Sequence, residues 1–205
     1  MDAREAYNLI AEDWHRDHAS DDWWIEGTDA FIQKLPVGSR VLDVGCGSGV
    51  KSEYLIAHGL SLTGIDVSDK LLEIARREVP EGRFMALSMT ELDSMQQTFD
   101  GVFAQASLLH IPKKDASLVV QKMAKRLVPR GFLYIAVKEA HKGRPEEEVV
   151  REHDYGQKFE RFFSYFTVPE LETYLVDAGL ETVLTLRNQS PSGKTVWLQI
   201  IGQKC

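Results

Sequence analysis

The sequence has few cysteines and no clear pattern of metal ligands. Its two cysteines, Cys46 and Cys205, lie too far apart in the chain for a two-cysteine metal knuckle, and they imply no disulfide framework. The histidines show no metal-ligand spacing beyond Asp13, His15 and His18, which are most simply explained as a solvated helix face. No apolar run approaches the length of a membrane span, and the polar start MDAREAYN is unlike a signal peptide. These absences predict a reduced, cytoplasmic protein without a metal or a membrane segment.

An excess of positive charge is also missing. The net charge is −7, and residues 1–31 account for all of it, with nine acidic and two basic residues. This acidic segment repels a phosphate polyanion, and no basic stripe with interleaved aromatics occurs elsewhere, so DNA and RNA are not expected as substrates. With 205 residues, 43% of them hydrophobic and 27% charged, the chain suits one α/β domain over residues 1–205.

A glycine-rich turn follows the first apolar strand. In the segment VLDVGCGSGV at residues 41–50, the apolar run predicts a buried strand, and residues 51–58 then have a helical pattern. Gly45, Gly47 and Gly49 lie between them, and without Cβ atoms they let a ligand approach the backbone. The helix N-terminus behind them offers free N–H groups to a carboxylate or phosphate. The alternative explanation is a tight strand-to-helix turn that binds nothing.

The spacing of these glycines narrows the choice of ligand. The dinucleotide fingerprint G-x-G-x-x-G requires a glycine at position 50, where this chain has Val50. A second predicted strand ends at Asp66, 17 residues after Gly49, where a carboxylate can accept both hydroxyls of a ribose. Asp66 can also cap the helix that begins near Ser68, and the two roles are compatible.

Together, DVGCGSG and GIDVS resemble the two cofactor motifs of class I S-adenosylmethionine-dependent methyltransferases, in particular the small bacterial enzymes of types 11 and 25. The similarity continues through FDGVFA at residues 99–104, LVPRGFLYI at residues 127–135 and FTVPELETYLVDAG at residues 166–179. The family usually has L-x-P-G-G in the second of these segments. Because Arg130 replaces the first glycine, we expect that this turn position does not require a positive φ. The match covers about residues 38–205, and residues 1–37 fit the variable N-terminal helical cap of the family.

Periodicity predicts alternating strands and helices. The expected strands are 40–44, 61–66, 83–87, 99–104, 131–137, 181–187 and 196–203, and the expected helices are about 2–18, 22–34, 51–58, 69–78, 113–127 and 169–178. This alternation predicts a three-layer αβα, Rossmann-like fold with a parallel sheet between helices. The segment Ser190–Gly193 predicts an antiparallel hairpin at the end. The resemblance implies seven strands in the order 3-2-1-4-5-7-6, with strand 7 antiparallel.

Residues 138–165 interrupt this rhythm. About 28 residues are long for a crossover loop, so we expect an insertion on the substrate side of the sheet. The charged stretch 144–152 predicts one solvated helix. The aromatic residues that follow, between positions 159 and 166, are expected to pack on the sheet, with one or two of them as candidates to line a pocket.

The resemblance also implies which residues bind the cofactor, S-adenosyl-L-methionine, whose product is S-adenosyl-L-homocysteine. The expected binding residues follow the first four strands: Asp43, Gly45, Cys46, Gly47 and Gly49; Asp66 and Val67; Ser88 and Met89; and Gln105. Ser88 stands where the family often has an acid near the adenine amine. Tyr7 and Trp14 are expected to close the site or, alternatively, to form only the apolar face of the first helix.

The expected activity is methyl transfer to a small molecule. Orientation can supply about 7–11 kcal/mol of such a barrier, whereas a general base adds only about 10²–10⁴-fold. His110, in the loop after the fourth strand, is the candidate base and Glu139 the second; packing before Pro112 is the alternative role of His110. A non-catalytic S-adenosylmethionine-binding module or activator subunit is the alternative function. Val50 disfavours a nicotinamide-dependent oxidoreductase.

Overall fold

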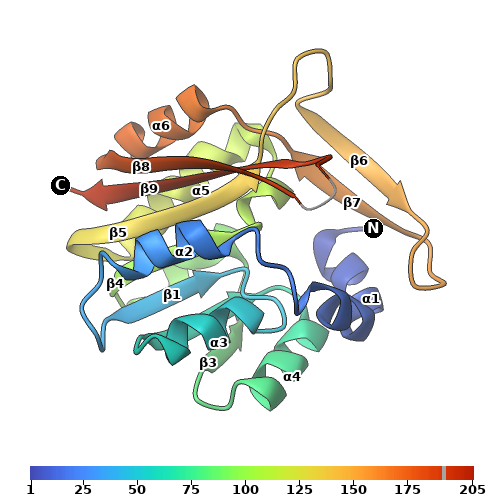
Figure 1. The fold of residues 1–205 in the computed structure, drawn as a ribbon, viewed down its shortest axis with the longest axis horizontal. Helices are drawn as coiled ribbons and strands as arrows, with labels where there is room; N and C mark the ends of the chain where they lie inside the picture. The colour runs from blue at the N-terminus through green and yellow to red at the C-terminus, as the bar shows by residue number, and fades with distance from the viewer. Residues whose placement is uncertain (191–192) are drawn as a thin grey trace.

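The computed structural model describes residues 1–190 and 193–205. Its main sheet contains, in spatial order, β3 (Arg83–Ala86), β2 (Ser61–Asp66), β1 (Arg40–Val44), β4 (Phe99–Gln105), β5 (Leu127–Lys138), β9 (Val196–Lys204) and β8 (Leu180–Gln189) (Figure 1). Neighbouring strands from β3 to β5 are parallel, and β9 is antiparallel to both β5 and β8. The expected Rossmann-like class with a mixed sheet is therefore confirmed.

Helices cover both faces of this sheet. They are α1 (Ala3–His18), α2 (Ile25–Ile32), α3 (Val50–Ala57), α4 (Asp69–Glu78), α5 (Lys113–Lys125) and α6 (Val168–Asp177), together with the short 3-10 helices η1 (Met89–Ser94) and η2 (Leu108–His110). One buried cluster joins α5 and α6 to the sheet, and a second joins α2 and α3 to its other face (Figure 1). Because both faces are covered, central strands such as β4 are buried almost throughout.

Local sequence signals begin several helices where we expect them. Asp2 and Glu5 form a capping box at the start of α1, in which the side chain of each residue accepts a hydrogen bond from the backbone N–H of the other. The Ser68 hydroxyl caps α4 by accepting the amide of Leu71. These side chains satisfy N–H groups that a helix N-terminus leaves without partners.

The prediction of a solvated helix in residues 144–152 is wrong. This stretch forms β6 (Glu147–Glu152), which pairs antiparallel with β7 (Phe159–Ser164) in a separate two-stranded hairpin. Val149 and Val150 favour a strand, and a charged residue on β6 faces an opposite charge on β7 in the pair Arg151–Glu160. The predicted strand order 3-2-1-4-5-7-6 is therefore wrong. The observed order is 3-2-1-4-5-9-8, because the hairpin strands β6 and β7 precede the last two strands of the main sheet in the chain.

The turn before β5 also differs from the expectation. Arg130 has φ +64°, so the inference that this position does not require a positive φ is wrong. The pairing of β4 with β5 shifts between Phe99 and Gly101, because Phe99 pairs with Leu127 and Gly101 with Phe132. The extra residues of β5 bulge out, and the left-handed conformation of Arg130 accommodates them at a cost of about 1–2 kcal/mol.

Smaller differences concern element ends. Helix α2 is shorter than the predicted 22–34, and β5 begins at Leu127 instead of Gly131. The backbone of Ser190 bonds to Thr195 and Gly193 and begins the expected turn between β8 and β9. Residues 191 and 192 of the predicted turn lie outside the described residues.

Candidate functional site

The carboxyl ends of the parallel strands bring the predicted binding residues to one edge of the sheet. The glycine turn follows β1, Asp66 ends β2, and Gln105 ends β4 in the strand beside β1. In open α/β sheets this edge is where ligands bind. Two surface hollows of about 190 and 170 Å³ lie instead around Arg130, near the amino ends of β4 and β5, and belong to a different edge.

The three turn glycines meet different constraints. All have positive φ: +77° at Gly45, +55° at Gly47 and +87° at Gly49. A Cβ at Gly45 would lie 2.3 Å from the Cβ of Ser107, so only glycine fits against the loop after β4. A Cβ at Gly47 would meet nothing within 4 Å, so this backbone is open to a ligand.

Asp66 holds the glycine turn from the neighbouring strand. Its carboxylate accepts the Gly47 amide at 2.8 Å through one oxygen and the Ser68 amide at 2.8 Å through the other. Burial raises the pKa of Asp66, while these backbone donors favour its charged form. The helix-capping alternative is thus partly present, because Asp66 accepts an amide at the start of α4. Sequence motifs 19 residues apart meet directly in this contact.

Asp43 and Cys46 lie beneath the turn. The Asp43 carboxylate is 2% exposed and accepts the Ser52 hydroxyl at 2.7 Å, which ties β1 to the first turn of α3. Burial raises the pKa of Asp43 to about 7. The Cys46 thiol is buried over Gly64 of β2, where a Cβ would lie 2.9 Å from its sulfur. In this geometry both side chains support the turn.

The residues predicted after β2 and β3 line the same edge. Val67 is half-buried and follows Asp66 directly. Ser88 caps η1 by accepting the amide of Thr90, and Met89 packs against the main core. The hydroxyl of Ser88 is thus engaged in a local turn with Thr90.

Gln105 is the least satisfied polar group of this edge. Its side chain belongs to a residue that is only 8% exposed, and neither its amide nitrogen nor its amide oxygen has a hydrogen-bond partner within the described chain. Buried amides are normally paired. The next residue, Ala106, has φ +52°, an uncommon strained conformation at the point where the chain leaves β4. Both observations indicate a place for a ligand.

Helix α1 covers the glycine turn. The His15 ring contacts the Ser48 hydroxyl at 3.0 Å, and the Asn8 side chain accepts the Ser68 hydroxyl at 2.8 Å. Tyr7 and Trp14 pack edge to face on the inner side of α1, with ring centroids 5.3 Å apart. The structure thus brings both predicted closing residues to the site, and it also gives them the helix packing of the alternative explanation.

A buried chain of hydrogen bonds joins α1 to the β6–β7 hairpin. The Nδ1 of His110 lies 2.8 Å from the carbonyl of Phe162, which can only accept, so Nδ1 carries the proton. In the neutral ring Nε2 then accepts the Tyr7 hydroxyl at 2.9 Å, and Tyr7 in turn accepts Arg161 at 3.1 Å. Burial lowers the pKa of His110 to about 4. His110 is therefore neutral near pH 7, with both ring nitrogens engaged.

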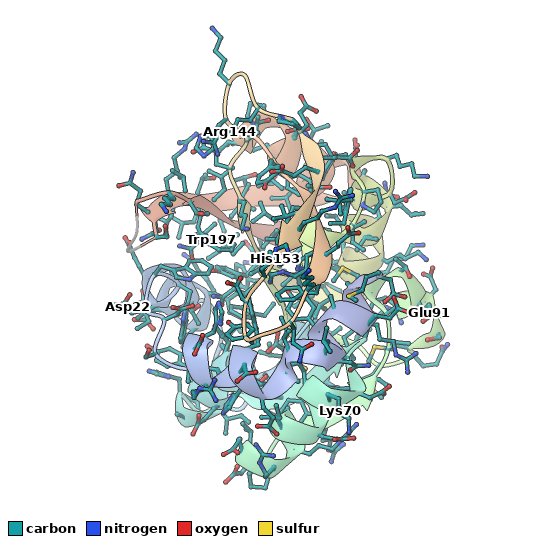
Figure 2. The ribbon with its side chains drawn as sticks, turned by 90° about the vertical axis from the view of Figure 1, so that its right-hand side faces the viewer. Asp22, Lys70, Glu91, Arg144, His153 and Trp197 are labelled. Atoms are coloured by element: carbon teal, nitrogen blue, oxygen red, sulfur yellow. The ribbon has the colours of Figure 1, made fainter. Side chains whose placement is uncertain are left out.

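Arg161 is a central residue of this cluster that sequence reasoning missed. It is 9% exposed, its guanidinium binds Glu152 at 2.5 and 2.6 Å, and it lies 4.7 Å from the centre of the Trp14 ring. Its importance depends on contacts across 154 residues with Tyr7, which no local pattern encodes. Figure 2 shows the hairpin, with His153 after β6, lying against α1.

Glu139, the second candidate base, is engaged elsewhere. Its carboxylate accepts the Arg187 guanidinium of β8 at 2.9 Å, and the structure does not join it to the His110 cluster. Lys138, one residue earlier, lies at the cluster instead: its Nζ is 3.8 Å from the centre of the Phe163 ring. Sequence reasoning missed Lys138, although its position at the end of the fifth strand places it at the ligand-binding edge of the sheet. Among the residues that the structure describes, no group of acids, histidines and cysteines has a metal-binding arrangement, and no helix is long and apolar enough to cross a membrane.

The open αβα sheet, with a glycine turn and an acidic residue at its carboxyl edge, has the architecture of the Rossmann-like class, in which this edge is the usual ligand-binding edge. Residues 41–131 match the family model described as a methyltransferase domain. The match covers somewhat less than half of the chain. It agrees with the resemblance of this region to class I S-adenosylmethionine-dependent methyltransferases.

Individual relatives agree with this assignment. The ubiquinone biosynthesis O-methyltransferase of Paracidovorax citrulli is 33% identical over 119 residues, 55% of this chain and 47% of the relative. The Bordetella avium protein of the same name is 35% identical over 118 residues, 55% of this chain and 46% of the relative. The chain thus spans about half the length of the curated relatives that it matches.

Solved structures confirm the fold over most of the chain. The Burkholderia thailandensis 1,6-didemethyltoxoflavin-N1-methyltransferase, solved with 1,6-didemethyltoxoflavin and S-adenosylhomocysteine, has a TM-score of 0.77 at 22% identity and covers 98% of this chain and 86% of its own. The Synechocystis magnesium protoporphyrin IX methyltransferase, solved with S-adenosylmethionine, has a TM-score of 0.74 at 18% identity, covering 98% and 95%.

Proposed function

We propose that this protein is an S-adenosylmethionine-dependent methyltransferase that acts on a small-molecule acceptor. The observation that carries the proposal is the hydrogen bond of 2.8 Å from the Gly47 amide to the Asp66 carboxylate. It joins the two cofactor-type motifs at the edge of the sheet where nucleotides bind. The family match over residues 41–131 supports the same function.

The residues present fit the cofactor. Each oxygen of Asp66 accepts one backbone amide, from Gly47 or Ser68, and a carboxylate has about four lone-pair sites in all. Two sites therefore remain for the hydroxyls of a ribose. A Cβ at Gly47 would meet nothing within 4 Å, so the backbone of the turn is open to the cofactor.

When bound, S-adenosylmethionine supplies a methyl group that its positively charged sulfur already activates. The contribution of the protein is then mainly to hold the acceptor in line with that methyl and to exclude water, and α1 and the β6–β7 hairpin are placed to do so. The role of His110 as a base stays a prediction. The low pKa of His110 and the engagement of Nε2 by Tyr7 favour a positioning role over proton removal.

Isothermal titration calorimetry tests this function directly. We expect the protein to bind S-adenosylmethionine and S-adenosylhomocysteine but not NAD, and to release S-adenosylhomocysteine with an acceptor from a metabolite panel. The relatives are named O-methyltransferases, which supports screening hydroxyl-bearing acceptors first. Binding of NAD without S-adenosylmethionine would refute the proposal. Cofactor binding without turnover across the whole panel would favour the alternative, a non-catalytic binding module or activator subunit.

A further inference from the structure

Three side chains share one face of the sheet next to the glycine turn. Gln105 of β4 pairs with Ala136 of β5, and Lys138 lies two residues further along β5. Because alternate residues of a strand point to the same side, Gln105 and Lys138 belong to one face. Lys138 in turn pairs with Trp197 of the antiparallel strand β9, which extends this face outward from the turn.

Two aromatic rings from separate elements lie near the Lys138 ammonium. Its Nζ lies 3.8 Å from the ring centre of Phe163 on β7 and 6.0 Å from that of Trp197 on β9. Trp197 stacks on Trp23, which precedes α2, with centroids 3.9 Å and planes 7° apart. Phe163 also contacts the His110 ring, with centroids 5.0 Å apart. The aromatic rings beside Lys138 therefore adjoin the hydrogen-bonded group that contains His110 and Tyr7. Figure 2 shows Trp197 on the side where the hairpin covers the sheet.

The Lys138 charge has aromatic neighbours but no ion-pair partner within the described chain. Two acids lie near it and are engaged elsewhere: Glu152 is held by two short hydrogen bonds to Arg161, and Glu148 accepts the Tyr165 hydroxyl at 2.7 Å. Burial is the main cause that lowers the pKa of Lys138 to about 8; Arg161 lowers it further, while Glu152 and Glu148 raise it. The side chain therefore remains mostly protonated near pH 7. A half-buried charge without a counterion is costly unless a ligand supplies one.

Two groups on this face thus lack a partner within the described chain: the half-buried ammonium of Lys138, which has no ion pair, and the amide of Gln105, whose nitrogen and oxygen are buried without a hydrogen bond. The two residues are on adjacent parallel strands and two positions out of register. A strand spacing of about 4.8 Å and a rise of about 3.3 Å per residue put their Cα atoms roughly 8 Å apart, a span that one small molecule can bridge with both side chains. The aromatic walls suit a flat, apolar body.

We propose that Lys138 and Gln105 form the acceptor subsite, and that the acceptor is an aromatic compound with an anionic oxygen, either a carboxylate or a phenolate. The ammonium binds the anionic oxygen, the Gln105 amide binds a second polar atom, and the rings of Phe163 and Trp197 hold the aromatic body. This subsite rests on the proposed function, because it places the acceptor beside the cofactor turn through β4.

The test measures binding of matched probes to the protein saturated with S-adenosylhomocysteine. The probes are benzoate and 4-nitrophenolate, with benzamide and nitrobenzene as their neutral counterparts. A charge-assisted hydrogen bond predicts that the wild type binds at least one anion about tenfold more tightly than its neutral counterpart. Lys138→Met and Lys138→Gln should lose this preference, and Lys138→Arg should keep most of it. Lys142→Met removes an exposed lysine of the adjoining loop and should keep it fully.

Each outcome has a distinct meaning. Preference for benzoate alone identifies a carboxylate acceptor, and preference for 4-nitrophenolate alone identifies a phenolate. Equal or absent binding of the anions and their neutral counterparts in the wild type would overturn the subsite. So would an unchanged preference in a folded Lys138→Gln protein that still binds S-adenosylhomocysteine. If the wild type does not bind S-adenosylhomocysteine at all, the proposed function fails together with the subsite.

Discussion

Replacement of Asp66 by alanine tests the centre of the proposed cofactor site. The carboxylate both holds the glycine turn, through the amides of Gly47 and Ser68, and offers its remaining lone pairs to a ribose. The substitution therefore affects two measurable quantities, the affinity for S-adenosylhomocysteine and the free energy of unfolding.

The structure sets the size of both effects. Loss of charge-assisted hydrogen bonds to the ribose should cost about 1.5–3 kcal/mol of affinity, or roughly a 10- to 100-fold rise in Kd. The two backbone amides lose their acceptor, which costs about 1–3 kcal/mol. The buried carboxylate, whose pKa burial raises, is removed at the same time and offsets part of that loss. We therefore expect the free energy of unfolding to fall by about 1–2 kcal/mol.

Calorimetry and urea denaturation measure these two changes, and Asp69→Ala is the matched control. Asp69 is a half-exposed acid three residues further along whose ion pair with Arg4 lies at the surface. Its loss removes the same charge and should leave both the stability and the Kd nearly unchanged, because an exposed ion pair contributes little. A folded Asp66→Ala protein with wild-type affinity would refute the assignment. Equal weakening by Asp69→Ala would attribute the effect to general charge instead of to the ribose contact.

Further predictions concern the turn, the hairpin and Lys138. Gly45→Ala should lower the free energy of unfolding by more than about 2 kcal/mol, because the new Cβ clashes with the loop after β4 and the residue has a positive φ. Gly47→Ala should cost only about 1–2 kcal/mol of backbone strain and should mainly weaken cofactor binding; urea denaturation compares the stabilities of the two variants. Arg161→Met should cost about 3 kcal/mol because it leaves the partly buried Glu152, whose side chain is 17% exposed, without its partner. The double variant Arg161→Met/Glu152→Met should recover much of this loss; a purely additive loss would contradict the prediction. Benzoate affinity should decrease as the pH rises through about 8, where Lys138 loses its proton; a constant Kd between pH 7 and 9.5 would disprove this dependence.

Much of the fold and the cofactor edge follows from local sequence patterns. Apolar runs and their spacing predicted the main strands and helices, and the glycines and Asp66 predicted which ends of those strands face a ligand. Such signals are readable because they depend on neighbours along the chain: the period of burial, the freedom of a residue without Cβ, and the caps of helix ends. That the turn at Gly47 and the carboxylate of Asp66 lie close together was predictable, because parallel strands bring their carboxyl ends to one edge of the sheet.

The remaining features were decided by contacts between distant segments. Residues 144–152 are charged enough to predict a solvated helix, but pairing with the aromatic strand β7 makes residues 147–152 a strand. The left-handed turn at Arg130 results from the shifted pairing of β4 and β5. Tyr7, His110 and Arg161 are separated by up to 154 residues and become one hydrogen-bonded group only when the hairpin packs on α1. The burial that lowers the pKa values of His110 and Lys138 comes from this packing and is absent from the sequence pattern.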